Sequence, residues 1–145
     1  MTRRVPTATY RLQLSRDFCL GWASARVPYL SRLGVDTLYV SPLLAARAGS
    51  PHGYDIVDPT RLNPELGSED DLAALAAALA AHDMGLVVDV VPNHLCVDTT
   101  ENLWWNDVLR RGRASEWARV FDIDWDHPDA EGRLLVPLLR APLAE

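Results

Sequence analysis

The chain has 145 residues, of which 48% are hydrophobic and 23% are charged, a composition typical of one soluble globular domain. The formal net charge of -6 at pH 7 argues against nucleic acid or an anionic membrane surface as the main partner, because neither attracts an acidic protein. No stretch approaches the roughly 18 apolar residues of a membrane span, and the N-terminus lacks the apolar segment of a signal peptide, so we expect a cytoplasmic protein. Cys19 and Cys96 match no metal-ligand spacing and are expected to be reduced thiols.

Three short apolar segments predict the strands of a parallel sheet. The first, "TATYRLQL" at residues 7–14, alternates and is rich in strand-forming residues. The second and third, "VDTLYV" at 35–40 and "LVVDVV" at 86–91, are nearly continuous apolar runs. Such runs are typical of strands that are buried on both faces, as in parallel sheets.

Two segments between these strands carry apolar residues at helical spacing. The first covers residues 22–33, and Gly34 follows it as a C-cap. Pro28 inside this pattern implies that the helix either kinks there or begins there. The second helix is predicted to begin after the N-cap Ser68, because acidic residues fill its first turn as the helix dipole favours, and its end is marked by Gly85.

Residues 43–67 contain three prolines and three glycines and show no sustained period, which predicts a long functional loop. The alternation of strands and helices predicts an α/β fold, either a doubly wound open sheet or an eight-stranded barrel. The turn at 15–21, "SRDFCLG", is not the glycine-rich turn of a dinucleotide-binding sheet, so the barrel is favoured. Because a complete barrel needs about 250 residues, we expect the first three strand-helix units of a (β/α)8 TIM barrel, at the front of a longer protein.

The pattern changes after His94. Residues 101–111 predict a helix, and "VFDIDW" at 120–125 predicts an acidic strand, but neither continues the alternation of the barrel. We therefore predict that residues 1–97 form the N-terminal part of the barrel. Residues 98–145 are predicted to form the start of an inserted subdomain, which is incomplete.

Polar residues collect where the second and third strands end, and this is where the active site of a parallel barrel lies. A carboxylate such as Asp89 within an apolar strand costs several kcal/mol unless it is hydrogen-bonded or paired. Each residue also has a structural interpretation: Asp89 as a buried acid paired to an arginine, His94 as a turn cap, Tyr54 as a core aromatic. Their coincidence at one face of the barrel favours a functional site.

Two motifs at this face resemble a known family. "DVVPNH" at 89–94 resembles a conserved motif of the alpha-amylase superfamily of glycoside hydrolases, found at the end of the third barrel strand, and "HGYD" at 52–55 resembles its tyrosine-bearing loop. A more specific combination is similar to the trehalose-forming glucosylmutases within that superfamily: "YRLQ" at 10–13, "GSPHGYDIVDPTRLNPELG" at 49–67 and "FDIDW" at 121–125.

The resemblance implies roles for individual residues. Tyr54 matches the tyrosine that stacks on the sugar ring beside the scissile bond, and His94 matches the histidine that hydrogen-bonds the hydroxyls of that sugar. Asp89 matches a supporting aspartate that is typically paired with an arginine beside the nucleophile and is not the nucleophile itself. His52 and Asp55 flank Tyr54 and are expected to line the same subsite.

Asn93 is a further candidate substrate-binding residue, and it matches a residue that ligates calcium in many amylases. Nothing else in the sequence forms a calcium-ligand set, so no metal is predicted. Trp104, Trp105, Trp117 and Trp125 are expected to pack inside the subdomain more often than to stack on sugars.

The implied reaction is an intramolecular transglycosylation with a maltooligosaccharide as substrate and no cofactor. It converts the reducing-end alpha-1,4 bond into an alpha,alpha-1,1 bond by retaining chemistry. The resemblance places the nucleophile and the acid on later strands, so we expect the chain to be catalytically silent alone and Asp89 to lack its arginine partner. Two alternatives stay open: the front of an amylase-type hydrolase, and a noncatalytic glucan-binding protein. The oligomeric state is not predicted.

Overall fold

The computed structural model describes residues 5–98 and 100–136. Three parallel strands, β1 (Thr9–Leu12), β2 (Thr37–Val40) and β5 (Gly85–Val88), form a sheet in the order β1-β2-β5. In register, Tyr10 lies opposite Leu38, and Leu38 lies opposite Leu86. The three predicted strands and their parallel direction are therefore confirmed, although each strand is shorter than its apolar segment.

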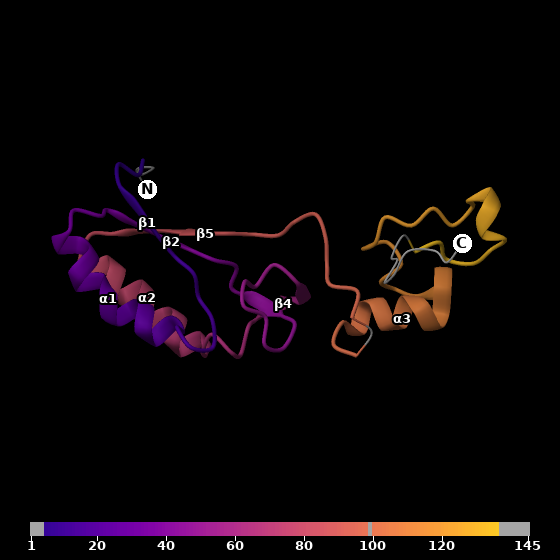
Figure 1. The fold of residues 1–145 in the computed structure, drawn as a ribbon, viewed down its shortest axis with the longest axis horizontal. Helices are drawn as coiled ribbons and strands as arrows, with labels where there is room; N and C mark the ends of the chain where they lie inside the picture. Colours follow the sequence, from indigo (N-terminus) through magenta and orange to yellow (C-terminus); the bar gives the residue numbers. More distant parts are fainter. Residues whose placement is uncertain (1–4, 99, 137–145) are drawn as a thin grey trace, which may run out of the picture.

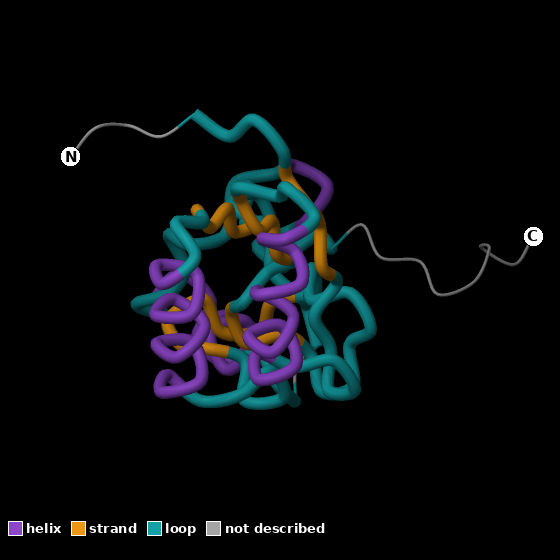
Figure 2. The backbone as a smooth tube through the Cα atoms, turned by 90° about the vertical axis from the view of Figure 1, so that its left-hand side faces the viewer, coloured by secondary structure: helices purple, strands orange, loops and turns teal. Residues whose placement is uncertain are grey.

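Helices α1 (Leu20–Arg32) and α2 (Glu69–Ala81) pack side by side against one face of this sheet (Figure 1). Figure 2, which views the molecule from the end that carries them, shows the two helices next to each other. The core between helices and sheet contains Leu20, Val27, Leu30, Leu38, Val40, Leu75 and Leu79. Pro28 lies inside α1, so the alternative in which the helix begins at Pro28 is wrong.

The predicted start of α2 is confirmed by a capping box. The Ser68 hydroxyl accepts the backbone N–H of Asp71 at 3.2 Å, and the Asp71 carboxylate accepts the backbone N–H of Ser68 at 2.8 Å. These two bonds satisfy donors that the helix itself leaves without partners. A three-residue spacing is a local signal, which is why the sequence alone revealed it.

The segment 43–67, predicted to be a loop, contains a two-stranded antiparallel sheet. Its strands are β3 (Leu44–Ala46) and β4 (Ile56–Leu62). The register shifts on both sides of Ala45, and Pro59 lies within β4. These irregularities interrupt the period of two that normally reveals a strand, so the sequence predicted only a loop where the structure has this hairpin.

The predicted helix near residues 101–111 is confirmed as α3 (Leu103–Arg111), which lies beyond the extended segment that follows β5 and far from α1 and α2 (Figure 1). Two short 3-10 helices follow, η1 (Gly112–Ala114) and η2 (Pro128–Ala130). Within the described residues only α1 and α2 cover the parallel sheet, so the third strand-helix unit is not complete there.

The stretch "VFDIDW" does not form the predicted strand. Its backbone makes turn hydrogen bonds, from Val120 to Trp117 at 2.9 Å and from Ile123 to Phe121 at 3.0 Å. Alternating residues resemble a strand in sequence, but a strand also needs a neighbouring strand to accept its backbone hydrogen bonds. The turn bonds supply those partners locally instead.

Two tryptophans of this region pack on each other, and a third packs inside it. The Trp104 and Trp117 rings stack with centroids 4.3 Å apart, and Trp105 packs against Phe121 at 5.0 Å. These contacts agree with the expectation that the tryptophans pack against other side chains, while the inserted subdomain itself stays a prediction. None of the helices in the described ranges is long and apolar enough to span a membrane.

Candidate functional site

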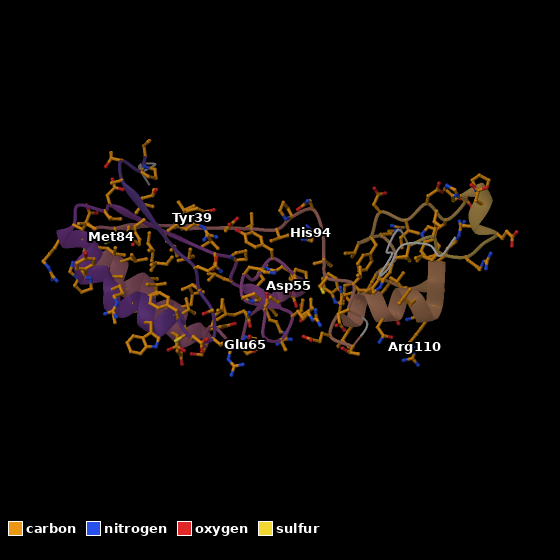
Figure 3. The ribbon with its side chains drawn as sticks, viewed as in Figure 1. Tyr39, Asp55, Glu65, Met84, His94 and Arg110 are labelled. Carbon is orange, nitrogen blue, oxygen red and sulfur yellow. The ribbon has the colours of Figure 1, made fainter. Side chains whose placement is uncertain are left out.

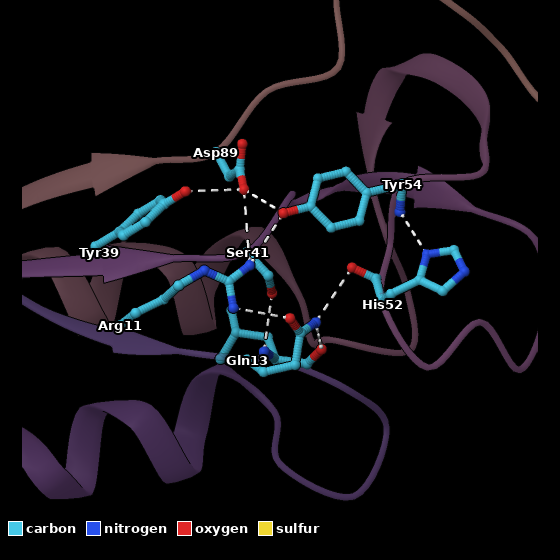
Figure 4. A network of polar contacts seen from close by, with 8 residues as sticks. Arg11, Gln13, Tyr39, Ser41, His52, Tyr54 and Asp89 are labelled. Carbon is cyan, nitrogen blue, oxygen red and sulfur yellow. Dashed lines mark hydrogen bonds and ion pairs between the residues drawn. The ribbon is translucent and has the colours of Figure 1, made fainter.

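Side chains from several elements meet at the C-terminal edge of the parallel sheet (Figure 4). Asp89 follows the last residue of β5, and its backbone N–H donates to the carbonyl of Val40 at 2.9 Å. The backbone of Asp89 is therefore held by a hydrogen bond to the sheet. The strand was predicted to extend to residue 91, but it ends at Val88. Its side chain is 19% exposed, so the carboxylate is partly buried rather than enclosed in an apolar strand.

Three side chains surround the Asp89 carboxylate. Its Oδ2 atom accepts hydrogen bonds from the hydroxyl of Tyr39, at 3.0 Å, and from the hydroxyl of Tyr54. The Nη2 atom of Arg11 lies 3.6 Å from the same oxygen. The expectation that Asp89 lacks an arginine partner is therefore wrong. The partner comes from β1, whereas the expected arginine belongs to a later strand.

Arg11 also connects β1 with the loop that carries Tyr54. Its Nη2 donates to the Tyr54 hydroxyl at 3.0 Å, and its Nη1 donates to the side-chain oxygen of Gln13 at 3.0 Å. Gln13 in turn donates to the backbone carbonyl of His52 at 3.1 Å. The Arg11 guanidinium lies over the ring of Tyr39, 5.2 Å from its centroid.

Sequence reasoning did not find Arg11, Gln13 or Tyr39. The signal was present in "YRLQ", because residues 11 and 13 of a strand share one face. The register then places Arg11 opposite Tyr39 of β2. The pairing of β1 with β2 is a contact between residues distant in sequence. The alternation of residues within one strand therefore could not predict that Arg11 lies beside Tyr39.

The hydrogen bond between Tyr54 and Asp89 shifts the pKa of both residues. The Tyr54 hydroxyl is the largest cause that lowers the pKa of Asp89, partial burial opposes it, and Tyr39 and Arg11 add to the lowering. The same hydrogen bond raises the pKa of Tyr54, because ionised Asp89 disfavours a second negative charge beside it. At neutral pH the site therefore holds an ionised Asp89 and a protonated Tyr54.

His52 and Asp55 brace the loop around Tyr54. The Nδ1 atom of His52 accepts the backbone N–H of Tyr54 at 3.0 Å and lies 3.8 Å from Oδ1 of Asp55. The Asp55 carboxylate also accepts the hydroxyl of Ser50, which accepts the backbone N–H of Gly53 at 3.0 Å. These bonds set the position of Tyr54, while contact of His52 and Asp55 with a sugar stays a prediction.

His94 and Asn93 lie on the extended segment past β5, where Figure 3 labels His94. Both side chains are exposed, and Nδ1 of His94 lies 3.3 Å from Oδ1 of Asn93. Within the described part of the chain, no hydrogen bond joins either residue to the cluster around Asp89. The structure therefore brings Tyr54 and Asp89 together. His94 and Asn93 follow Asp89 closely in sequence but make no described hydrogen bond to this cluster.

Residues of the segment from Asp89 to His94 line several surface cavities. Asp89 lines one of about 430 Å³, and Asn93 and His94 line one of about 370 Å³ together with Trp104. His94 also lines a hollow of about 600 Å³ in the region of α3. Their volumes are typical of sites for small organic ligands. Among the described residues, no three His, Cys, Asp or Glu side chains are grouped in a way that fits a metal ion.

Comparison with known proteins relates these features to families. The alpha-amylase catalytic-domain family model matches residues 22–137. A putative maltooligosyl trehalose synthase of Mycobacterium tuberculosis is 50% identical over 138 residues, which cover 91% of this chain and 18% of that protein. The chain therefore spans about a fifth of the length of this curated relative.

The solved structures show the same likeness. The maltooligosyltrehalose synthase from Arthrobacter ramosus superposes with a TM-score of 0.82 and 52% identity, over 86% of this chain and 17% of that one. Alpha-amylase 2 of Dictyoglomus thermophilum is more distant, with 34% identity over 49% of this chain and 12% of its own length.

Proposed function

The chain belongs to the alpha-amylase catalytic-domain family, and we propose that within this family it forms the N-terminal portion of a trehalose-forming glucosylmutase. The observation that carries this proposal is the likeness to the Arthrobacter ramosus synthase, with 52% identity over 86% of the chain. The proposed substrate is a maltooligosaccharide. Its reducing-end alpha-1,4 bond is converted into an alpha,alpha-1,1 bond, without a cofactor.

The residues of this chain bind and orient the reacting sugar in the proposed reaction. Tyr54 supplies a flat apolar face for the ring beside the scissile bond, and exposed His94 supplies a hydrogen bond to its hydroxyls. Asp89 stays ionised and anchors Tyr54. Asp55 and Asp89 both accept hydrogen bonds from neighbouring hydroxyl groups. This supports the proposal that they have supporting roles and that the nucleophile and the acid are residues outside 1–145.

The chemical steps follow the retaining pattern of the family. An external carboxylate attacks the anomeric carbon, the alpha-1,4 bond breaks, and the external acid protonates the departing glucose. The released glucose turns within the site, and its anomeric hydroxyl attacks the covalent intermediate while the same acid, now a base, takes the proton. No water is consumed, so the product is an isomer of the substrate.

An amylase-type hydrolase is the second candidate, because the Dictyoglomus thermophilum amylase is 34% identical over about half of the chain. The two candidates differ in whether water or the released glucose attacks the intermediate. A mutase consumes reducing ends without releasing glucose, whereas a hydrolase increases reducing ends.

A chimera tests the proposal. Residues 5–136 replace the matching segment of the Arthrobacter ramosus synthase, and the chimera is incubated with maltopentaose. We expect reducing ends to disappear without free glucose, as with the unaltered synthase. Net hydrolysis by the chimera alone would support the amylase alternative instead. The 145-residue chain by itself is expected to form no product, and a trehalosyl product from it would contradict the external position of the nucleophile.

A further inference from the structure

We propose that Arg11 is a positioning residue of the sugar site, which orients Tyr54 and Asp89 so that Tyr54 meets the sugar with its ring face and not with its hydroxyl. The assignment of the ligand as a sugar rests on the proposed function. The positioning itself rests on the contacts of Arg11 with its neighbours (Figure 4).

The hydroxyl of Tyr54 is already occupied by protein groups. A phenol has one proton to donate, and Tyr54 donates it to Asp89. The same oxygen accepts a hydrogen bond from Nη2 of Arg11 at 3.0 Å. Tyr54 therefore has no proton left for a sugar hydroxyl unless it gives up Asp89. The surface that remains for recognition is the ring, which suits the apolar face of a pyranose.

The guanidinium of Arg11 is planar, and its two terminal nitrogens contact different parts of the chain. Nη2 approaches Tyr54 and Asp89, at 3.0 and 3.6 Å, while Nη1 binds Gln13 at 3.0 Å. Gln13 holds the loop through the His52 carbonyl, 3.1 Å away. A lysine in this place is a single point charge and cannot donate in both directions with one fixed geometry.

The position of Arg11 follows from the strand order. β1 lies beside β2, so Arg11 is opposite Tyr39, and β5 on the other side of β2 presents Asp89 just past its end. The Arg11 guanidinium also lies over the ring of Tyr39, which adds a cation-π interaction. Because the Arg11 side chain is 37% exposed, its ion pair contributes little to stability. Its effect is therefore expected in orientation rather than in folding.

The first test measures the 145-residue chain itself and needs no catalysis. Arg11→Met is compared with the parent by following the Asp89 carboxyl carbon in an NMR pH titration. We expect the pKa of Asp89 to rise in Arg11→Met, because Arg11 is one of the groups that lower it. Arg11→Lys keeps the charge and is expected to leave the Asp89 titration nearer to that of the parent.

Arg111→Met is the matched control. Arg111 and Asp107 of α3 also lie 3.6 Å apart, and the Arg111 side chain is likewise exposed. This variant is expected to leave the Asp89 titration unchanged. An Asp89 pKa in Arg11→Met equal to that of the parent would overturn the proposal, whether or not the proposed reaction is correct.

The second test uses the chimera with the Arthrobacter ramosus synthase. We expect Arg11→Met to lower kcat on maltopentaose at least about tenfold with a smaller change in KM, because a displacement of about 1 Å at a reacting centre costs up to about a hundredfold. Arg11→Lys is expected to stay impaired, since it lacks the planar guanidinium. Added guanidinium ion is expected to restore part of the activity of an Arg11→Gly variant.

These readouts separate positioning from a structural role. A structural role predicts a lower melting temperature, no rescue by guanidinium, and no selective loss of kcat. An unchanged kcat in Arg11→Met contradicts the proposal. An inactive parent chimera counts against the proposed function only, because the titration of Asp89 still decides the role of Arg11.

Discussion

Tyr54 donates its hydroxyl hydrogen to the carboxylate of Asp89 across 35 residues of sequence. Tyr54 comes from the loop before β4, whereas Asp89 follows the last residue of β5. Tyr39 of the central strand binds the same carboxylate oxygen at 3.0 Å. One carboxylate thus joins the hairpin segment to the parallel sheet, and its ionisation is coupled to the position of the tyrosine.

Tyr54→Phe is expected to raise the pKa of Asp89 towards its ordinary value, because the lost hydroxyl is the largest cause of its lowering. A carboxylate with a lowered pKa in the folded state stabilises the fold above its unfolded pKa of about 4, and this stabilisation is lost as the pH falls through the folded pKa. The variant should therefore show a smaller loss of stability between pH 6 and pH 2. The carboxyl carbon of Asp89, titrated by NMR, measures the shift directly.

The control for this prediction is Tyr29→Phe, which removes the hydroxyl of an exposed tyrosine on α1. It should leave the titration of Asp89 as in the parent. An equal shift in both variants would mean that the hydrogen bond from Tyr54 does not determine the acidity of Asp89.

His94→Ala in the chimera is expected to lower kcat/KM about tenfold, the value of one hydrogen bond of about 1.4 kcal/mol. The melting temperature should not change, because the side chain is exposed on the segment past β5. His82→Ala, which removes another exposed histidine at the end of α2, is the control and should retain full activity. Full activity of His94→Ala would exclude His94 from sugar binding.

Asp36→Asn is expected to flatten the acid dependence of stability. Asp36 accepts the hydroxyl of Thr7 and its backbone N–H, the latter at 2.9 Å, and the hydroxyl is the largest cause that lowers the pKa of Asp36. The charged form therefore stabilises the fold above the unfolded pKa, and this contribution is lost as the pH falls. Urea midpoints at pH 6 and pH 3 should differ less in the variant than in the parent. Asp17→Asn, at an exposed position, should keep the difference seen in the parent.

Ser68→Ala is expected to destabilise the chain by about 1 kcal/mol, because it removes the hydroxyl half of the capping box of α2. Urea unfolding at pH 7 measures this loss. Ser24→Ala inside α1 removes a hydroxyl without removing a cap, so its effect should stay within about 0.5 kcal/mol. Equal losses in the two variants would show that the capping box does not stabilise α2.

The elements that sequence predicts correctly depend on neighbours a few residues apart. Ser68 and Asp71 identify the start of α2, and continuous apolar runs identify β2 and β5. The hairpin of β3 and β4 was missed because Pro59 and the shifts around Ala45 break its alternation. The stretch at 120–125 was predicted to be a strand because it alternates, but its backbone bonds are made within turns.

The site divides in the same way. Local motifs identified Tyr54, Asp89 and His94 as candidates and placed polar residues at the ends of parallel strands, because motif and period are properties of short segments. Only the tertiary structure decided that Arg11 and two tyrosines surround Asp89, and that His94 lies outside this cluster. The physical reason is that strand order and register depend on contacts between distant residues, and no short segment contains both partners of such a contact.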